Sequence, residues 1–388
     1  MGQAPGTVAE RFALNGRVLS AAPLGEGHIN ATYVVATESE GGTGSRYVLQ
    51  RINRVVFRDP KAVMRNVERV IAQLGSKARE EGGQRDREVL NLIPTRKGSS
   101  FLCDGEGEVW RCYAMIEGAT ARSTRAGPAQ AFTVAKAFGR FLRRLFDFPG
   151  NTLAITIPGF HDTGRHMQAL RNSVRSDPLD RARGTLAELE FIEEHQELID
   201  SWVNLLSSED VPTRVVHNDT KMDNVLIDDD SELAVCVIDL DTVMPGSALF
   251  DVGDCARSAL TGPEEIGQPL DLGVFDAVVQ GYFAEVGGLL TDAEVDHIVL
   301  ATQAAALELG IRFLADHIAG DRWFPAARPA KNLDRCRVQL KLVERIDVNT
   351  DRMTAIVRRA SRSRRGRQRG STEPNPLRFR IDGGRSRA

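Results

Sequence analysis

Two polar segments near the middle of the chain carry residue types that could transfer a phosphoryl group. Residues 215–227 contain the pattern H-x-D-x-x-x-x-N between two apolar runs. Transfer to a hydroxyl needs a carboxylate that orients the incoming oxygen and takes its proton. We therefore predict that Asp219 is the catalytic base, that Asn224 holds Mg²⁺, and that His217 braces the loop. The alternative is a polar loop in which Asp and Asn serve only as turn residues.

The second segment, residues 234–241, is an apolar strand that ends in Asp239 and Asp241. Mg²⁺ prefers one or two carboxylates together with phosphate oxygens. We predict that Asp239 is a metal ligand, and that Asp241 is either a second ligand or a substrate contact. A solvated strand end is the alternative, but the two segments in this order favour a kinase.

A glycine-containing turn near the N-terminus could bind the nucleotide phosphates. Residues 23–30 include Gly25 and Gly27, whose backbone N–H groups could approach phosphate oxygens. We predict that Arg51 binds the α- and β-phosphates, because its guanidinium fork suits phosphate oxygens. Glu68 is the candidate partner of Arg51. Either side chain could instead be solvated on its strand or helix.

The surrounding residues predict a small strand-rich lobe followed by a larger helical lobe. Short β-branched runs separated by glycines, one amphipathic helix from Pro60 and a hairpin around residues 101–115 make up the first third. Three long helical patterns follow, at 130–146, 186–206 and 291–318. We expect an α+β fold with a lobe at 1–117, a second lobe at 118–356 and a tail at 357–388. ATP is expected at the hinge, near Met115 and Glu117.

Composition narrows the compartment and the partners. Of the 388 residues, 42% are hydrophobic and 27% are charged, which is ordinary for a globular protein. We find no apolar run of membrane-spanning length and no basic-then-apolar leader. The five cysteines are scattered without a CxxC pair, which is typical of reduced thiols. We therefore expect a cytoplasmic protein with no membrane partner; the oligomeric state stays open.

The C-terminal tail differs sharply from the rest of the chain. From Arg358 onward it has eleven arginines and two acidic residues, a net charge of +9 in a chain of net charge −3. The body is therefore acidic. A segment so poor in apolar residues is expected to be disordered. Because it lacks interleaved aromatic residues beyond Phe379, we expect no specific nucleic-acid binding.

These motifs resemble the aminoglycoside phosphotransferase and choline kinase group, which has a protein-kinase-like fold. The resemblance extends from about Leu24 to Phe324 and is strongest toward bacterial N-acetylhexosamine 1-kinases. It rests on four segments: Gly25-Glu26-Gly27-His28-Ile29-Asn30, Leu49-Gln50-Arg51-Ile52-Asn53, Asn218-Asp219-Thr220-Lys221 and the run from Val237 to Gly246.

The resemblance implies roles for particular residues. Asp219 matches the family's base, and Asn224 and Asp239 match its metal ligands. His28 and Arg312 match positions that contact the sugar, while Trp323 stands where a tyrosine is usual. The other residues expected to support the site are Lys221, Asp251, His217, Asp241 and Glu68. Ala31 departs from the acidic residue usual at its position, which leaves the sugar open.

Taken together, the residues and the resemblance predict an ATP- and Mg²⁺-dependent kinase of a small-molecule hydroxyl. The acceptor implied by the resemblance is the anomeric hydroxyl of an N-acetylhexosamine, which Asp219 and Asp239 would contact beside the sugar-binding residues. The alternatives are an aminoglycoside, a choline-like alcohol or another sugar, and a non-catalytic nucleotide-binding protein.

Overall fold

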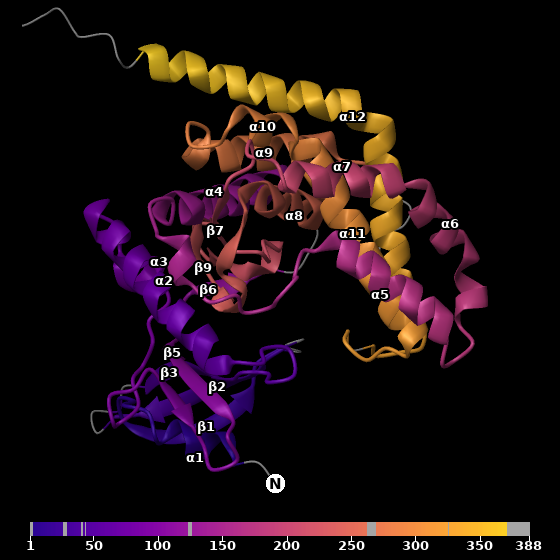
Figure 1. Cartoon of the computed structure of the whole chain (residues 1–388). Coiled ribbons are helices and arrows are strands. Elements are labelled where there is room, and N and C mark those ends of the chain that lie inside the picture. Colours follow the sequence, from indigo (N-terminus) through magenta and orange to yellow (C-terminus); the bar gives the residue numbers. More distant parts are fainter. Residues whose placement is uncertain are drawn as a thin grey trace, which may run out of the picture.

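A five-stranded antiparallel sheet forms the N-terminal part of the molecule (Figure 1). The computed structural model describes residues 3–25, 29–39, 42, 44–122, 126–261, 269–324 and 326–370, with side chains up to residue 362 in the last range. The sheet has the order β1-β2-β3-β5-β4. Its strands are β1 (Arg17–Pro23), β2 (Ala31–Glu38), β3 (Gly44–Arg51), β4 (Phe101–Cys103) and β5 (Val109–Ala114).

The two faces of this sheet pack against different parts of the chain. Leu49, Trp110 and Cys112 lie on one face, in a small core with residues near α1 (Pro5–Ala9). Tyr113 lies on the other face, in a core with helix α2 (Pro60–Glu80). Because side chains alternate along a strand, Gln50 and Arg111 share the face of Tyr113. This second face is the one that meets the remainder of the molecule.

Helix α2 starts where its sequence predicts. Asp59 caps its first turn by accepting a hydrogen bond from the Ala62 N–H at 3.0 Å, and Pro60 occupies the first turn. Its apolar stripe is buried against the sheet and against Leu240. The helix continues to Glu80, beyond the last apolar position that the sequence pattern indicates.

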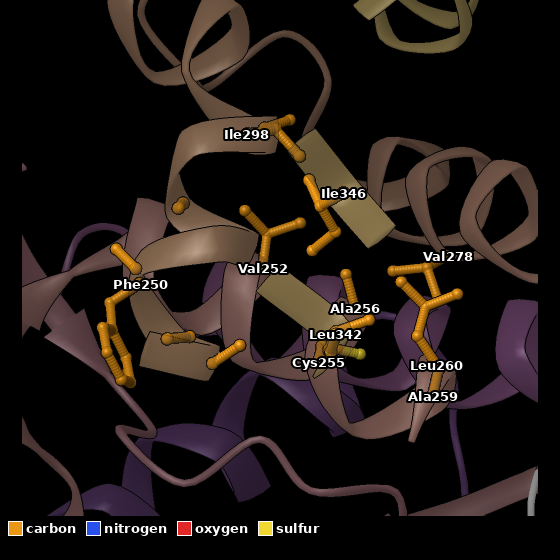
Figure 2. Packing of buried hydrophobic residues seen from close by; sticks show 14 of the residues in the cluster. Phe250, Val252, Cys255, Ala256, Ala259, Leu260, Val278, Ile298, Leu342 and Ile346 are labelled. Carbon is orange, nitrogen blue, oxygen red and sulfur yellow. The ribbon is translucent and has the colours of Figure 1, made fainter. Parts of the chain in front are cut away.

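The C-terminal part is mostly helical and has its own core (Figure 2). Helix α11 (Ile298–Ala319) is almost entirely buried and packs against several neighbouring helices. Phe250, Val252 and Cys255 of α8 face this core. The remaining helices are α3 (Arg85–Glu88), α4 (Pro128–Arg144), α5 (Thr163–Ser176), α6 (Leu186–Glu194), α7 (Gln196–Leu206), α8 (Ala248–Leu260), α9 (Leu272–Val286), α10 (Asp292–Asp296) and α12 (Lys331–Gly370).

Two small sheets sit between the lobes and hold the polar loops. Strand β7 (Thr213–Val216) pairs with β10 (Met244–Ser247), and β8 (Val225–Asp228) lies between β6 (Ala119–Ala121) and β9 (Ala234–Val237). The loop from β7 to β8 carries Asp219, and the turn after β9 carries Asp239. The α+β class expected from the sequence is therefore confirmed.

Two expectations about the helices need correction. No apolar run of membrane-spanning length was expected, whereas α11 is long and apolar enough to cross a membrane; 72% of its apolar window is buried inside the molecule. The tail was expected to be disordered from residue 357, whereas α12 continues to Gly370. Val357 is 3% exposed, because the end of the apolar pattern of α12 reaches into the core. Residues 371–388 lie outside the described part of the chain.

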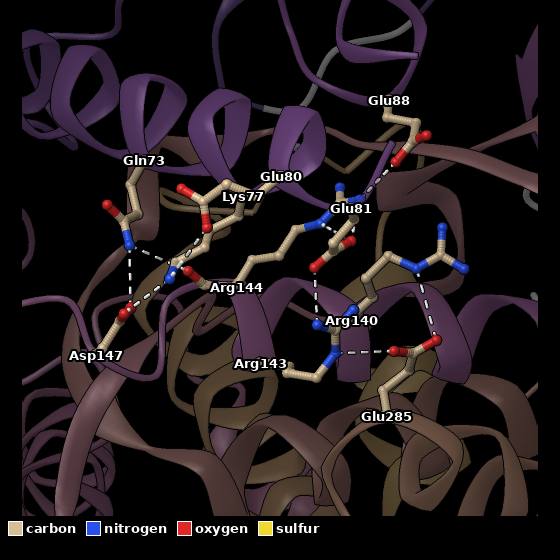
Figure 3. A network of polar contacts seen from close by, with 10 residues as sticks. All are labelled: Gln73, Lys77, Glu80, Glu81, Glu88, Arg140, Arg143, Arg144, Asp147 and Glu285. Carbon is tan, nitrogen blue, oxygen red and sulfur yellow. Dashed lines mark hydrogen bonds and ion pairs between the residues drawn. The ribbon is translucent and has the colours of Figure 1, made fainter. Parts of the chain in front are cut away.

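An ionic cluster joins α2 to α4 across the two parts of the molecule (Figure 3). Arg144, 6% exposed, binds Glu81 at 2.8 Å and Glu88 at 2.6 Å. Lys77 binds Asp147 at 2.9 Å. Helix α2 is thereby fixed at its C-terminal end to the helical lobe, and we call these five residues the interlobe latch.

Candidate active site

Asp219 lies in a loop that its neighbours hold in place. The Asn224 side-chain amide donates hydrogen bonds to the Asp219 carbonyl at 2.8 Å and to Oδ2 at 3.0 Å. Lys221 Nζ lies 3.1 Å from the same Oδ2. The carboxylate therefore keeps an orientation set by two residues of its own loop.

The protonation of this loop follows from its contacts. Burial raises the pKa of Asp219, but the charge of Lys221 and the hydrogen bonds outweigh burial, so its pKa falls below the usual value. The Asp219 charge in turn raises the pKa of Lys221. His217 donates from Nε2 to the Ile238 carbonyl at 2.9 Å and accepts the Asp219 N–H at Nδ1. Since burial also lowers its pKa, His217 is a neutral brace.

Asp251 holds the backbone of the same loop from helix α8. Its carboxylate accepts the N–H groups of His217 and Asn218, both at 2.8 Å. Burial raises the pKa of Asp251 to about 7, and these two bonds oppose that rise. Thr242 adds a bond from its hydroxyl to the His217 carbonyl at 2.8 Å. The Asp219 loop is thus fixed by α8 and by the turn after β9.

Asp239 and Asn224 have free oxygen atoms that suit a hard cation. Asn224 uses only its amide nitrogen on Asp219, and within the described residues neither its Oδ1 nor the Asp239 carboxylate takes a hydrogen bond. Burial, followed by the charges of Asp241 and Asp219, raises the pKa of Asp239 to about 7. A dication would relieve this repulsion. The described residues hold no cluster of three or more His, Cys, Asp or Glu side chains that could bind a metal alone, so phosphate oxygens would have to complete a Mg²⁺ site.

Asp241 is a structural anchor between the two parts of the molecule. It is 1% exposed, forms an ion pair with Arg111 of β5 and accepts the Asn30 amide at 2.7 Å. Arg111 also donates to Gln50 at 2.9 Å, and the Asn53 N–H donates to Asn30 at 3.0 Å. The glycine-turn segment and strand β5 therefore meet at the Asp241 carboxylate, and Gln50 and Asn53 hold the two residues that contact it.

The expected phosphate site at Arg51 is not formed. Arg51 lies on the other face of the sheet, with its guanidinium 5.7 Å from the Trp110 ring centroid, because side chains alternate along β3. Glu68 accepts a hydrogen bond from Ser100 instead of pairing with Arg51. Arg111 is the cation on the face of β5 that meets Asp241.

The other expected nucleotide residues are only partly described. Gly25 has a φ of +65°, which glycine adopts without strain, whereas Gly27 and His28 lie outside the described residues. The Met115 N–H donates to the Arg46 carbonyl at 3.1 Å. Glu117 is exposed and forms an ion pair with Arg46. Met115 and Glu117 thus lie at the crossing from β5 to β6.

Arg312 of helix α11 lies among aromatic rings and interacts electrostatically with Asp219. Its guanidinium is 3.8 Å from Glu308 and lies 5.1 Å from the Phe160 ring centroid and 5.7 Å from that of Phe324. Burial lowers the pKa of Arg312, although the charges of Glu308 and Asp219 oppose this. Trp323 is 64% exposed, so Phe324 is the aromatic residue beside Arg312.

Sequence reasoning missed Arg111, Glu308 and His161. Arg111 interrupts an apolar strand and Glu308 interrupts an apolar helix, and a lone charge in a buried element is a usable signal. His161 carries no such signal, because it lies in an irregular segment before α5. Asp251, which the resemblance assigned to loop support, does contact the loop.

One cavity of about 250 Å³ lies between α4, β9 and the end of α2. Phe141, Val235 and Leu240 line it together with Arg140 and Arg144. It includes none of the residues around Asp219, so we do not assign the acceptor to it.

The two-lobed fold and the Asp219 loop define a phosphotransferase that acts on small-molecule alcohols. The chain belongs to the phosphotransferase enzyme family whose model, APH, matches residues 20–288. It therefore has a protein-kinase-like fold, as expected.

Solved structures of small-molecule kinases have the same fold. An aminoglycoside phosphotransferase from Alicyclobacillus acidocaldarius is 14% identical over 94% of this chain and 98% of that one, with a TM-score of 0.59. An amicoumacin kinase solved with AMP-PNP, Ca²⁺ and Ami is 15% identical over 87% and 92%, with a TM-score of 0.61. A choline kinase from Cryptosporidium parvum is 13% identical over 87% and 91%, with a TM-score of 0.53.

Proposed function

We propose that the protein transfers the γ-phosphoryl group of ATP to a hydroxyl of a neutral sugar. The preferred acceptor is the anomeric hydroxyl of an N-acetylhexosamine, as the sequence motifs imply. An anomeric hydroxyl is more acidic than an ordinary alcohol, so a carboxylate is a sufficient base. Most of the rate enhancement would then come from positioning and from neutralising charge.

The residues of the Asp219 loop have distinct parts in this reaction. Asp219 orients the acceptor hydroxyl and takes its proton at Oδ1 or Oδ2, and its lowered pKa keeps it ionised near neutral pH. Lys221, 3.1 Å from Asp219, can offset negative charge on the transferring group. His217 and Asp251 keep the loop in place without exchanging protons with the acceptor.

Asn224 and Asp239 would hold Mg²⁺. Their unengaged oxygens, described above, are the hard ligands that this ion selects. When bound, the ion would neutralise the charge of the phosphate groups. The amicoumacin kinase, which has the same fold, was solved with the nucleotide analogue AMP-PNP and a divalent cation, Ca²⁺.

The observation that favours a neutral acceptor is the setting of Arg312. Its guanidinium interacts electrostatically with Asp219, is flanked by Phe160 and Phe324, and is only partly neutralised by Glu308 at 3.8 Å. A cationic acceptor near Asp219 would meet this positive charge. A sugar would gain hydrogen bonds from the guanidinium and packing from an aromatic face.

An acceptor screen that follows ADP release tests this proposal. We expect turnover with N-acetylglucosamine or N-acetylgalactosamine, and little with choline or aminoglycosides. Arg312→Ala should raise the acceptor KM roughly ten- to hundredfold, because a sugar hydroxyl left unpaired costs about 1–3 kcal/mol, while the KM for ATP should stay nearly constant. Arg65→Ala is the matched control, since that arginine is exposed on α2 and pairs with Asp59. Preference for a cationic acceptor would contradict the proposal.

A further inference from the structure

The buried carboxylate of Glu308 lies 3.8 Å from Arg312 and has no part in the reaction proposed above. Glu308 is 1% exposed in the middle of the apolar helix α11. A buried charge is costly unless it is paired and hydrogen-bonded. Glu308 has such partners: His161 Nδ1 lies 2.9 Å from Oε1, and the Thr163 hydroxyl donates to Oε2 at 2.7 Å.

The second ring nitrogen of His161 reaches the catalytic loop. Nε2 lies 2.8 Å from the carbonyl oxygen of Asn218, the residue directly before Asp219. A carbonyl oxygen can only accept, so Nε2 carries a hydrogen. His161 also stacks on Phe250 of α8, with ring centroids 3.6 Å apart. The ring therefore has a fixed plane and two fixed partners.

The two hydrogen bonds of His161 determine how many protons the His161–Glu308 pair carries. With Nε2 protonated, the short contact between Nδ1 and Oε1 needs one further hydrogen, on the ring or on the carboxyl group. The Thr163 donor and the Arg312 cation both stabilise the carboxylate form of Glu308. Burial raises the pKa of Glu308, but His161, His166 and Arg312 outweigh burial and lower it.

The groups around this pair come from three helices. Glu308 and Arg312 belong to α11, His166 to α5 and Asp251 to α8. His166 donates from Nε2 to the Phe160 carbonyl at 2.9 Å, and burial lowers its pKa. His166 Nε2 lies 4.0 Å from Glu308 and is bonded to Phe160, so His161, at 2.9 Å, is the histidine within hydrogen-bond distance of Glu308.

We propose that His161, as an imidazolium held between Glu308 and the Asn218 carbonyl, is a positioning residue that couples Arg312 to the Asp219 loop. Asn218 donates its N–H to Asp251 and accepts from His161 at its carbonyl, so the residue directly before Asp219 is held on both of its flanking peptides. Glu308 is shared by His161 and Arg312. The acceptor-binding cation and the base are thus positioned by one ion pair. This inference rests on the proposed function for its kinetic consequence only.

The test compares two histidines that each contact a backbone carbonyl, a carboxylate and a phenylalanine ring. His161→Phe keeps the ring stacked on Phe250 and removes both hydrogen bonds. His195→Phe is the matched control: His195 also bonds a carbonyl and a carboxylate and stacks on Phe191, but it lies between α6 and α7 beside Asp347. We expect His161→Phe to lower kcat about ten- to hundredfold with an unchanged KM for ATP, and His195→Phe to leave kcat unchanged.

A second variant separates the two partners of the ring. Glu308→Gln allows a neutral His161 to keep its bond to Asn218 while Arg312 loses its counter-charge, so it should raise the acceptor KM more than it lowers kcat. If His161→Phe alone folds poorly because Glu308 is left unpaired, the double variant removes that charge and should retain the kcat loss. Equal kinetic effects at His161 and His195 would overturn the proposal.

Nitrogen-15 NMR of histidine-labelled protein tests the protonation of His161 without any substrate. Two protonated ring nitrogens are expected for His161 in the unaltered protein, and one in Glu308→Gln. A single protonated nitrogen in the unaltered protein would overturn the inference. Absence of turnover with every acceptor would instead refute the proposed function, because the NMR result does not depend on it.

Discussion

At the scale of single residues, a buried ion pair joins the lobes beside the candidate base. Arg111 is 1% exposed and its only carboxylate partner within the described residues is Asp241. Asp241 lies two residues after the candidate metal ligand Asp239. The position of β5 therefore fixes the turn that carries Asp239, which explains why an arginine occupies an otherwise apolar strand.

Replacing Arg111 by methionine should destabilise the protein by about 3–5 kcal/mol, because it leaves the Asp241 charge buried without a cation. The double variant Arg111→Met/Asp241→Asn should recover part of this loss, since no uncompensated charge remains. Arg51→Met is the control on the opposite face of the sheet, where a stacked cation contributes at most about 1 kcal/mol. Urea unfolding measures all three. Similar losses for Arg51→Met and Arg111→Met would show that the pair has no special role.

At the scale of elements, α2 is the part of the sheet lobe most firmly tied to the helical lobe. The interlobe latch holds its C-terminal end, and the Asn66 amide donates to the Val243 carbonyl at 3.1 Å near its N-terminal end. Val243 follows the turn that carries Asp239 and Asp241. Rotation of α2 would therefore disturb both the latch and the candidate metal site.

Arg144→Met should cost about 1–3 kcal/mol of stability, because Glu81 and Glu88 lose their least exposed partner. Arg65→Met on α2 is the control, since the exposed Arg65–Asp59 pair should contribute less than about 1 kcal/mol. Burial raises the pKa of Glu81, but hydrogen bonds from Arg144 and Arg143 lower it overall. The latch should therefore persist near neutral pH and be lost as the pH falls through this lowered pKa. Thermal unfolding at neutral and acidic pH gives both results, and equal midpoints for the two variants would contradict the account.

Local sequence patterns predicted several elements of the fold and site, whereas features that depend on tertiary packing could not be predicted. Strand periods and glycine turns predicted the sheet lobe, and the H-x-D-x-x-x-x-N pattern predicted the loop that Asn224 and Asp251 hold. The face of Arg51 was not predictable, because residues 47–49 are apolar at both parities of the strand. His161 joins Glu308 across 147 residues of sequence, and only tertiary packing brings them together. The helical end of α12 was missed because arginine also favours helices.

At the scale of the whole molecule, the two lobes contribute different groups to the surroundings of the Asp219 loop. The sheet lobe contributes Arg111 and Asn30, which anchor Asp241, whereas the helical lobe contributes Glu308, His161 and Arg312. Electrostatic interactions link Asp239 to Arg111 and Asp219, and link Asp219 to Arg312. Charged groups of both lobes therefore act on the Asp219 loop.

The central claim is that Asp219 is the base for phosphoryl transfer, and ADP release with an N-acetylhexosamine acceptor tests it most directly. Asp219→Asn should lower kcat by about 10²–10⁴, because the acceptor proton then has no carboxylate to receive it. Calorimetry should show that this variant still binds Mg·ATP, which separates lost chemistry from lost binding. Turnover close to that of the unaltered protein would contradict the account.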